Sequence, residues 1–275
     1  MVACAQIAPA KAELEANLDK IADLIEQGSA EGASLIVFPE AATTGYFLEG
    51  GVAELALTQD ELVAGLLSRL KGRLREPTDA LVGFYQTELG NLYNAACYME
   101  LGPDGGRAVH TYRKFFLPTY GVFDEERFVS RGRDAGVFQS RLGRVGVLIC
   151  EDVWHSVLPA IAAVRGAQLI IVPSASPARG FSGDQIGNLA RYERLLTAVS
   201  EEHGVYCINA QLTGFEGGKG FVGGSMVVDP FGRLVAQGPV QEEHLLLAEI
   251  NLELIEIARM QSPLLSDLQS AWGDV

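Results

Sequence analysis

The sequence predicts an α/β protein made of two similar halves, in which helices cover sheets. The first observation is an apolar strand-like run at residues 2–8, followed by helical periodicity over 11–29 and a second strand-like run at 34–38. The second is that the same strand-helix-strand order returns after residue 145. Strands joined through a helix need a crossover connection, which favours a sheet with helices on its face.

The first half can be followed element by element. Pro9 ends the first strand, and Pro39 ends the second. The apolar residues that repeat at helical spacing between them are Leu14, Leu18, Ile21, Leu24 and Ile25. The segments that follow are predicted as a helix at 60–75 and strands at 80–85, 92–99 and 107–112. The glycine-rich residues 102–106 predict a hairpin turn, because glycine readily adopts positive φ.

The second half repeats the opening order with a strand at 145–150, a helix at 156–164 and a strand within 166–174. Residues 166–174 (GAQLIIVPS) parallel residues 32–40 (GASLIVFPE) position by position. We interpret this as internal duplication, with chance similarity as the alternative. The later elements are predicted as a helix at 185–203, strands at 205–210, 223–229, 234–237 and 245–250, and a helix at 252–260.

Composition limits the function classes. The net charge of −14 would repel a phosphate backbone, and no Lys/Arg cluster with interleaved aromatics offsets it, so we expect no nucleic-acid partner. No apolar stretch approaches 18 residues and no charged signal-peptide region opens the chain, so we expect no membrane span and a cytoplasmic location. With no linker-like segment, residues 1–275 are expected to form one domain.

The four cysteines are scattered, with no CxxC pair and no nearby His at ligand spacing, so neither zinc nor a disulfide framework is predicted. Cys4, Cys97 and Cys207 lie inside apolar runs, where cysteine is ordinarily a small buried hydrophobe. Cys150 differs, because it closes the apolar run of 145–149 and is followed at once by Glu151 and Asp152. A thiolate placed at such a strand end can attack a carbonyl.

Two other reactive side chains also come directly after predicted strands. Glu40 follows Ile-Val-Phe-Pro, and Lys114 follows Thr-Tyr-Arg. Because strand ends place ligands and catalytic groups, the three side chains can converge on one cleft. There a carboxylate takes the thiol proton, the thiolate attacks, and an ammonium holds the oxyanion. Taken singly, Glu40 could equally cap a turn and Lys114 could be a solvated surface charge.

In order along the chain, these three motifs resemble the signatures of the nitrilase superfamily of carbon-nitrogen hydrolases. They read Pro-Glu at 39–40, YRK…LP at 112–118 and GVLICED at 146–152. The resemblance covers essentially the whole chain and implies a four-layer α-β-β-α sandwich. It also implies Glu40 as general base, Lys114 as stabiliser of the tetrahedral intermediate and Cys150 as the nucleophile that forms a thioester. The backbone N–H of Glu151 would be the second oxyanion donor.

Many members of this superfamily carry a second Glu in the loop after the Lys. Glu125 is our choice for that role, with Glu126 as the adjacent alternative. The same loop, residues 117–125, together with CEDVW at 150–154, SASP at 174–177 and GGS at 223–225, looks like the glutaminase domain of glutamine-dependent NAD synthetase. No ATP-binding Ser-Gly-Gly loop follows, so we expect that the chain does not itself make NAD. Residues 178–184 also lack the Gly-Lys and downstream Arg of that branch.

The substrate-binding residues are predicted in these motifs and the loops around them: Tyr46, Tyr120, Phe123, Glu151, Trp154, Ser174 and Arg179. Arg179 could replace the missing contact to a substrate carboxylate. No metal or organic cofactor is expected. The glycine-rich run 214–220 lacks the spacing of a phosphate loop, and His155 is badly placed to serve as the base for Cys150.

The leading hypothesis is an amidase that hydrolyses a small carboxamide to the acid and ammonia through a cysteine thioester. Alternatives are a glutaminase subunit that supplies ammonia to a separate synthetase, a nitrile or N-carbamoyl hydrolase, and an inactive scaffold of the same fold. The resemblance also implies a homodimer or higher homo-oligomer. Residues 262–272 form an apolar-bearing tail that packs either on a second subunit or back on its own chain.

Overall fold

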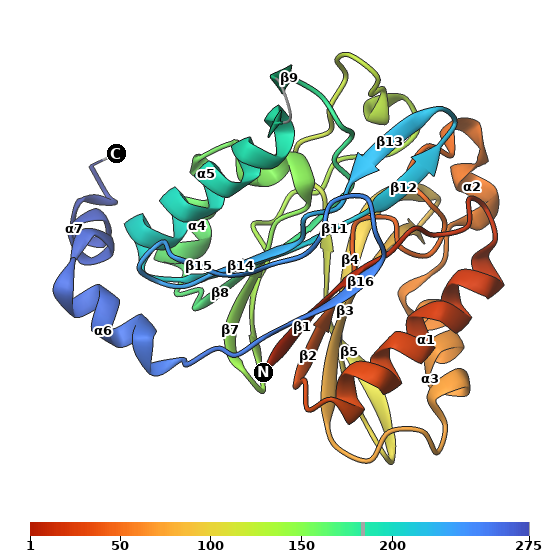
Figure 1. The fold of residues 1–275 in the computed structure, drawn as a ribbon, viewed down its shortest axis with the longest axis horizontal. Helices are drawn as coiled ribbons and strands as arrows, with labels where there is room; N and C mark the ends of the chain where they lie inside the picture. The colour runs from red at the N-terminus through yellow and green to blue at the C-terminus, as the bar shows by residue number, and fades with distance from the viewer. Residues whose placement is uncertain (183–184, 275) are drawn as a thin grey trace.

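Two six-stranded sheets face each other, and helices cover their outer faces (Figure 1). The structure is a computed structural model that describes residues 1–182 and 185–274. The first sheet has the strand order β16-β1-β2-β3-β4-β5. Its strands are β1 (Val2–Gln6), β2 (Leu35–Val37), β3 (Thr78–Glu88), β4 (Asn91–Gly102), β5 (Gly105–Arg113) and β16 (His244–Ala248). The predicted four-layer sandwich is confirmed.

The second sheet has the order β15-β14-β11-β8-β7-β6. Its strands are β6 (Val137–Ser140), β7 (Gly143–Val147), β8 (Leu169–Ser174), β11 (Tyr206–Gln211), β14 (Met226–Val228) and β15 (Leu234–Gln237). Two small ribbons complete the strands: β9 (Phe181–Ser182) with β10 (Gln185–Ile186), and β12 (Thr213–Glu216) with β13 (Lys219–Val222).

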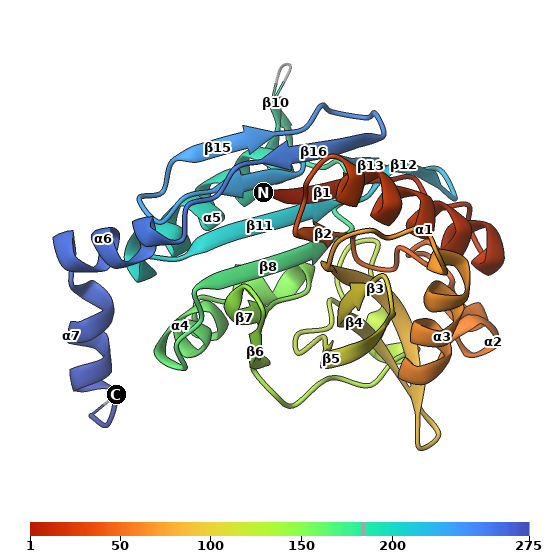
Figure 2. The same ribbon diagram turned by 90° about the horizontal axis from the view of Figure 1, so that it is seen from below.

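The helices fall into two groups on opposite sides of the sheets (Figure 2). On the side of the first sheet are α1 (Leu14–Ala30), α2 (Val52–Leu55) and α3 (Gln59–Leu70). On the side of the second are α4 (Val157–Val164), α5 (Gly187–His203), α6 (Glu253–Gln261) and α7 (Leu264–Ala271). The described residues also form short 3₁₀ helices: η1 (Glu49–Gly51), η2 (Glu125–Arg127) and η3 (Cys150–Trp154).

The two halves share one topology, as the repeated sequence predicts. In the first, β1, β2 and β3 are parallel neighbours joined through α1 and α3, and β4 and β5 continue antiparallel. In the second, β7, β8 and β11 are parallel neighbours joined through α4 and α5, and β14 and β15 continue antiparallel. An antiparallel edge strand completes each sheet, β16 beside β1 and β6 beside β7.

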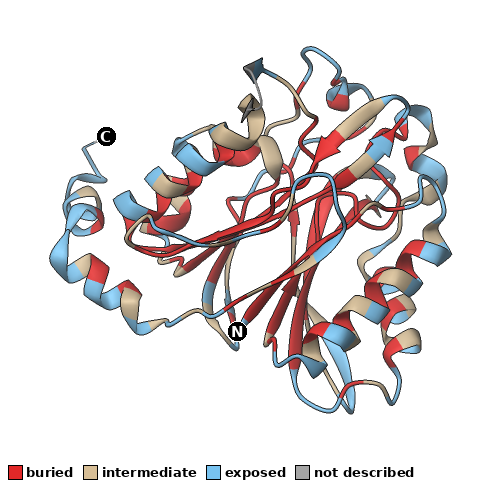
Figure 3. Ribbon diagram, in the orientation of Figure 1, coloured by how far each residue is buried: buried red, intermediate tan, exposed pale blue. Residues whose placement is uncertain are grey.

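The hydrophobic core is built mainly from strands that are buried on both faces (Figure 3). In β1, Val2 and Cys4 join the cluster between the sheets, while Ala3 and Ala5 pack toward α1. This alternation follows from the two-residue period of a strand. A strand covered on both sides reads as a continuous apolar run, which is why these runs could be recognised from the sequence.

Other parts differ from the sequence-based expectation. The β6 strand and the β12–β13 ribbon were not predicted, and the glycine-rich run 214–220 forms this hairpin. The tail at 262–272 folds back as α7 against α4 and α5, and leaves Leu264 and Trp272 exposed. Within the described residues, no helix combines the length and hydropathy needed to cross a bilayer.

Gly83 in β3 allows the segment after β2 to lie directly against the sheet. A Cβ atom at this position would be 2.1 Å from the carbonyl oxygen of Pro39 and 2.8 Å from the Cα of Glu40. Because both contacts are with backbone, rotation of a side chain cannot relieve them. The backbone position of Glu40 therefore depends on a glycine in the neighbouring strand.

We expect Gly83→Ala to lower the free energy of unfolding by about 2 kcal/mol, since overpacking a rigid core typically costs this much. Denaturant unfolding would measure the change. Gly51→Ala is a matched control, because an added Cβ at Gly51 meets nothing within 4 Å. Equal stability losses in the two variants would contradict the proposed close approach at Gly83.

Candidate active site

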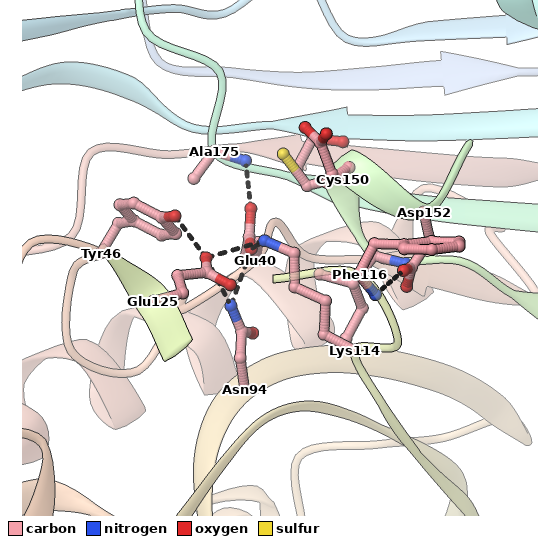
Figure 4. A network of polar contacts seen from close by, with 12 residues as sticks. Glu40, Tyr46, Asn94, Lys114, Phe116, Glu125, Cys150, Asp152 and Ala175 are labelled. Atoms are coloured by element: carbon pink, nitrogen blue, oxygen red, sulfur yellow. Dashed lines mark hydrogen bonds and ion pairs between the residues drawn. The ribbon is translucent and has the colours of Figure 1, made fainter. Parts of the chain in front are cut away.

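Four side chains named from the sequence come together at one end of the two sheets (Figure 4). Glu40 lies just after β2, and Lys114 directly after β5. Glu125 begins η2, and Cys150 begins η3. The first three belong to the first sheet and the connection that follows it, while Cys150 follows a strand of the second sheet. The site is therefore formed where the two halves meet.

Lys114 is at the centre of this group. Its ammonium donates to Glu40 Oε1 at 2.6 Å and to Glu125 Oε1 at 2.7 Å. The Lys114 and Glu40 side chains are fully buried, and Glu125 is 7% exposed. Burial alone would lower the pKa of Lys114, but the charges of Glu125 and Glu40 hold that pKa well above its usual value. The lysine thus stays a cation between two carboxyl groups.

The remaining contacts fix the two carboxyl groups. Glu40 Oε1 accepts from Asn94 Nδ2 at 2.8 Å, and Glu40 Oε2 accepts from the backbone N–H of Ala175 at 2.8 Å. Glu125 Oε1 also accepts from the Tyr46 hydroxyl. Glu125 Oε2 is buried and has no hydrogen-bond partner among the described residues. Both oxygens of Glu40 thus have hydrogen-bond partners, whereas one oxygen of Glu125 has none among the described residues.

Burial raises the pKa of Glu125 from its usual 4.5 to about 7; the Lys114 ammonium opposes this rise and the Glu40 charge adds to it. Two carboxyl groups that share one ammonium therefore differ in environment. Glu126, the alternative considered from the sequence, is exposed and lines a separate surface cavity. Of the two neighbours, the structure brings only Glu125 to Lys114.

The sequence placed Cys150 as the last residue of a strand, and this boundary is wrong. The β7 strand ends at Val147, and Cys150 is the first residue of η3 with φ of +50°. A non-glycine residue rarely adopts this left-handed conformation, which costs about 1–3 kcal/mol and often marks a functional position. The sharp turn directs the sulfur toward the group around Lys114 (Figure 4).

Burial raises the pKa of the Cys150 thiol above its usual range, and the Glu40 charge adds to this. The Lys114 ammonium, the Tyr192 hydroxyl and the Ala175 amide act in the opposite direction. Burial and the Glu40 charge therefore favour the protonated form of the Cys150 thiol. Burial raises the pKa of Cys4 to about 12 and that of Cys97 to about 11, consistent with core cysteines.

Asp152 ties the cysteine turn to the segment after Lys114. Its fully buried carboxylate accepts from Phe116 N at 2.7 Å and Phe115 N at 3.1 Å through Oδ1. Through Oδ2 it accepts from Ile149 N at 3.0 Å and from the Tyr112 hydroxyl at 2.7 Å. Burial raises the pKa of Asp152 to about 6, against the effect of these donors. One side chain thus connects the turn after β7 to the segment that follows β5.

The predicted substrate-binding residues lie at different depths. Tyr46 and Phe123 line a cavity of about 440 Å³ together with Glu125. Tyr120, Glu151, Trp154 and Arg179 line a second cavity of about 460 Å³ nearer the surface. Ser174 is fully buried, accepts from Asn209 Nδ2 at 3.0 Å and lines neither of these two cavities.

The second cavity, called the outer cavity from here on, is lined by side chains of both signs of charge. The Tyr120 hydroxyl donates to Glu151 Oε2 at 2.8 Å, and the Arg179 guanidinium lies 4.9 Å from the centre of the Phe123 ring. The Arg191 guanidinium lies 4.1 Å from the centre of the Trp154 ring. The sequence segment 178–184 that departs from the NAD synthetase pattern is described up to Ser182, and Gly183 and Asp184 lie outside the described residues.

Sequence reasoning missed several residues that shape the site. Asn94 in β4 bonds to Glu40, and Tyr192 in α5 donates to the Cys150 sulfur. Glu216 in the β12 hairpin accepts from the backbone N–H groups of Tyr46 and Phe47 at 2.8 and 2.9 Å. A polar side chain inside an apolar strand was a signal for Asn94. Among residues 1–182 and 185–274, no group of three or more His, Cys, Asp or Glu side chains is arranged to hold a metal ion.

The fold and the site can now be compared with known proteins. A family model described as carbon-nitrogen hydrolase matches residues 1–260. The chain belongs to the carbon-nitrogen hydrolase family. Its fold is that of the nitrilase superfamily, to which the amidase of Nesterenkonia AN1 also belongs. The expectation of a carbon-nitrogen hydrolase, made from three short motifs, is confirmed at this level.

Individual members of the family differ in architecture. A glutamine-dependent NAD(+) synthetase of Thermotoga maritima is 30% identical over 92% of this chain, which spans 42% of that relative's length. A glutamine-dependent NAD+ synthetase structure from Acinetobacter baumannii has a TM-score of 0.76 and 26% identity, with 89% of this chain and 44% of the other covered. This hydrolase therefore corresponds to less than half of either synthetase.

A second kind of relative is similar in size. The structure of a variant amidase from Nesterenkonia sp. AN1, with acrylamide added to its active-site cysteine, has a TM-score of 0.74 and 27% identity. The alignment covers 98% of each chain. This hydrolase is thus similar to an amidase over nearly the whole of both chains and to one part of the synthetases.

We expect Asp152→Asn to lower the free energy of unfolding by about 2–3 kcal/mol, because one carboxylate oxygen would become an N–H₂ group facing N–H donors. Chemical denaturation would measure this. Asp104→Asn in the exposed turn between β4 and β5 is the control. If the free energy of unfolding fell no more in the Asp152 variant than in the control, Asp152 would not join the cysteine turn to the segment after Lys114 as inferred.

The raised pKa of Glu125 predicts how stability depends on pH. Between pH 4.5 and about 7 the folded protein binds the Glu125 proton more tightly than the unfolded chain does, so this contribution to stability is lost as pH rises through 7. Relative to Glu125→Gln, which cannot ionise, the wild type should lose about 1–3 kcal/mol between pH 5 and pH 8. Unfolding at both pH values would test this, with Glu126→Gln as the control.

Proposed function

We propose that the chain hydrolyses the carbon-nitrogen bond of a small carboxamide to the acid and ammonia through a thioester on Cys150. One observation carries the proposal: the buried Lys114 ammonium bonds to Glu40 and Glu125, and the Cys150 sulfur lies beside this group (Figure 4). In this assignment Glu40 is the general base, Lys114 the oxyanion stabiliser and Cys150 the nucleophile.

Acylation begins when the Cys150 thiol gives its proton to Glu40. The sulfur electron pair forms the S–C bond to the amide carbonyl carbon, and the carbonyl π pair moves onto oxygen. When the C=O bond re-forms, the C–N bond breaks and the nitrogen takes the proton from Glu40 to leave as ammonia. Deacylation follows the same path with water, from which Glu40 removes a proton, and the Cys150 thiolate leaves and is protonated again.

The contacts of Lys114 support its assignment. An ammonium has three N–H bonds, and the two carboxyl groups accept from two of them. The third is available to a substrate oxygen without loss of the existing ion pairs. The backbone N–H of Glu151, next to the nucleophile, is proposed as a second donor to that oxyanion.

The free oxygen of Glu125 suits a different part of the substrate. Glu125 Oε2 is buried without a hydrogen-bond partner among the described residues, while its Oε1 is held by Lys114 and Tyr46. An amide N–H₂ group donates two hydrogen bonds, so Glu125 can fix the plane of the amide before attack. We propose that Tyr46 and Phe123 form the apolar wall beside it.

A second candidate is a glutaminase that supplies ammonia to a separate synthetase. The outer cavity offers Glu151 to an α-ammonium group and Arg179 to an α-carboxylate, as a glutamine-like substrate requires. The Thermotoga maritima relative is named as a glutamine-dependent NAD(+) synthetase, and this chain spans only part of it. That the chain forms homo-oligomers and that it is located in the cytoplasm both stay predictions.

Ammonia release should identify the substrate class when glutamine, asparagine, simple ω-amides, N-carbamoyl amino acids and nitriles are compared. On the best substrate, Cys150→Ala should lower turnover by about a thousandfold or more, since the nucleophile would be absent. Cys207→Ala, in a buried strand of the second sheet, is the control. Full activity of the Cys150 variant would refute the mechanism.

The two candidates can be separated by adding a partner. Robust release from simple amides by the chain alone favours the free-standing amidase. Weak release from glutamine that rises when an ammonia-dependent synthetase is added favours the glutaminase subunit.

A further inference from the structure

Tyr192 is a buried polar residue that the proposed mechanism does not use. It lies in α5 and is fully buried. Its hydroxyl donates to the Cys150 sulfur, with 3.2 Å between Oη and Sγ. The nucleophile assigned from the sequence thus has a direct hydrogen-bond donor on a helix far along the chain.

The packing around Tyr192 fixes this donor in place. Its ring packs edge-on against Trp154 of η3, with ring centres 5.6 Å apart. Helix α5 contacts η3, the 3₁₀ helix that Cys150 begins. Because the tyrosine ring cannot move without disturbing this contact, the hydroxyl is aimed at the sulfur before any substrate binds.

The other groups around the sulfur act from different elements. The charge of Glu40, after β2, raises the pKa of Cys150, whereas the Lys114 ammonium, after β5, and the Tyr192 hydroxyl lower it. A negative charge on Cys150 in turn raises the pKa of Tyr46. Glu40 can take the proton, but its negative charge opposes the formation of a thiolate. The Lys114 ammonium already donates to two carboxyl groups. A neutral donor on the α5 side therefore adds to the stabilisation that the Lys114 ammonium and the Ala175 amide give to a thiolate at Cys150.

We propose that Tyr192 is a further catalytic residue, whose hydroxyl donates a hydrogen bond to the Cys150 sulfur as negative charge develops there. This inference rests on the proposed function of Cys150 as the nucleophile. A hydrogen bond to a charged acceptor is stronger than one to a neutral acceptor, so the contact strengthens as the S–H bond breaks. The same bond stabilises the thiolate when it leaves the acyl group during deacylation.

Tyr192 keeps its own proton throughout. Burial raises the pKa of its hydroxyl well above the usual value, and a negative charge on Cys150 raises this pKa further. The hydroxyl therefore acts as a hydrogen-bond donor, while Glu40 remains the group that accepts the thiol proton.

The test compares Tyr192→Phe with Tyr206→Phe. Phenylalanine keeps the ring and its packing and removes only the hydroxyl. Tyr206 is a matched control because it is also a buried tyrosine, in β11, and its hydroxyl bonds to the backbone of Asn251. Two quantities are measured for each protein: kcat and KM for ammonia release, and the rate at which iodoacetamide alkylates Cys150 across pH 6–10.

We expect Tyr192→Phe to lower kcat about tenfold with little change in KM, and to lower the alkylation rate at pH 8 by a similar factor. The alkylation profile should move to higher pH. Mass spectrometry assigns the product to Cys150, and Cys4, Cys97 and Cys207 are buried and serve as internal controls. Unchanged kcat and an unchanged alkylation profile in a folded Tyr192→Phe protein would overturn the inference.

Failure of this inference can be told apart from failure of the proposed function. If Cys150→Ala abolishes ammonia release while Tyr192→Phe behaves like wild type, only the role of Tyr192 is wrong. If Cys150→Ala retains activity, the proposed function is wrong. In that case the alkylation profile still reports whether the hydroxyl influences the sulfur.

Discussion

The buried ion pairs of Lys114 constrain everything around them. Removing one ammonium and two carboxyl groups from water costs several kcal/mol per ion before the mutual attraction is counted. Close partners for the charged atoms offset much of this cost, so the chain around the site must be placed accurately. Asn94, Ala175 and Tyr46 supply such partners to Glu40 and Glu125. A site of this kind tolerates little movement of the elements that carry it.

That accuracy comes from backbone features as well as side chains. Gly83 allows the chain at Glu40 to lie against β3, and Cys150 adopts a left-handed conformation that turns its sulfur inward. Asp152 then bonds both to the cysteine turn and to the segment after Lys114. Strain at the cysteine and close approach at the glycine persist because the surrounding hydrogen bonds hold them.

Local signals in the sequence predicted most strands and helices and the convergence of Glu40, Lys114 and Cys150, whereas the four-layer sandwich was predicted from the resemblance to the nitrilase superfamily. Glu40 and Cys150 each follow an apolar run and Lys114 follows a strand that ends Thr-Tyr-Arg, so their placement just after strands could be predicted. The repeated GA…P pattern likewise predicted two similar halves. Tyr192 could not be found in this way, because its role depends on which element lies opposite α5, and for Asn94 the only signal was a polar residue inside an apolar strand. The boundary at Cys150 was missed because a positive φ at a non-glycine residue leaves no mark in hydropathy.

The duplicated topology divides the chemistry unequally between the halves. Glu40 and Lys114 belong to the first sheet, whereas Cys150 and Tyr192 belong to the second sheet and its covering helix. One half carries the proposed base and the proposed oxyanion stabiliser, and the other carries the proposed nucleophile. Neither half is a smaller version of the enzyme. Because β16 comes from the end of the chain and lies beside β1, a single cut between β5 and β6 would divide the first sheet as well as the group of site residues.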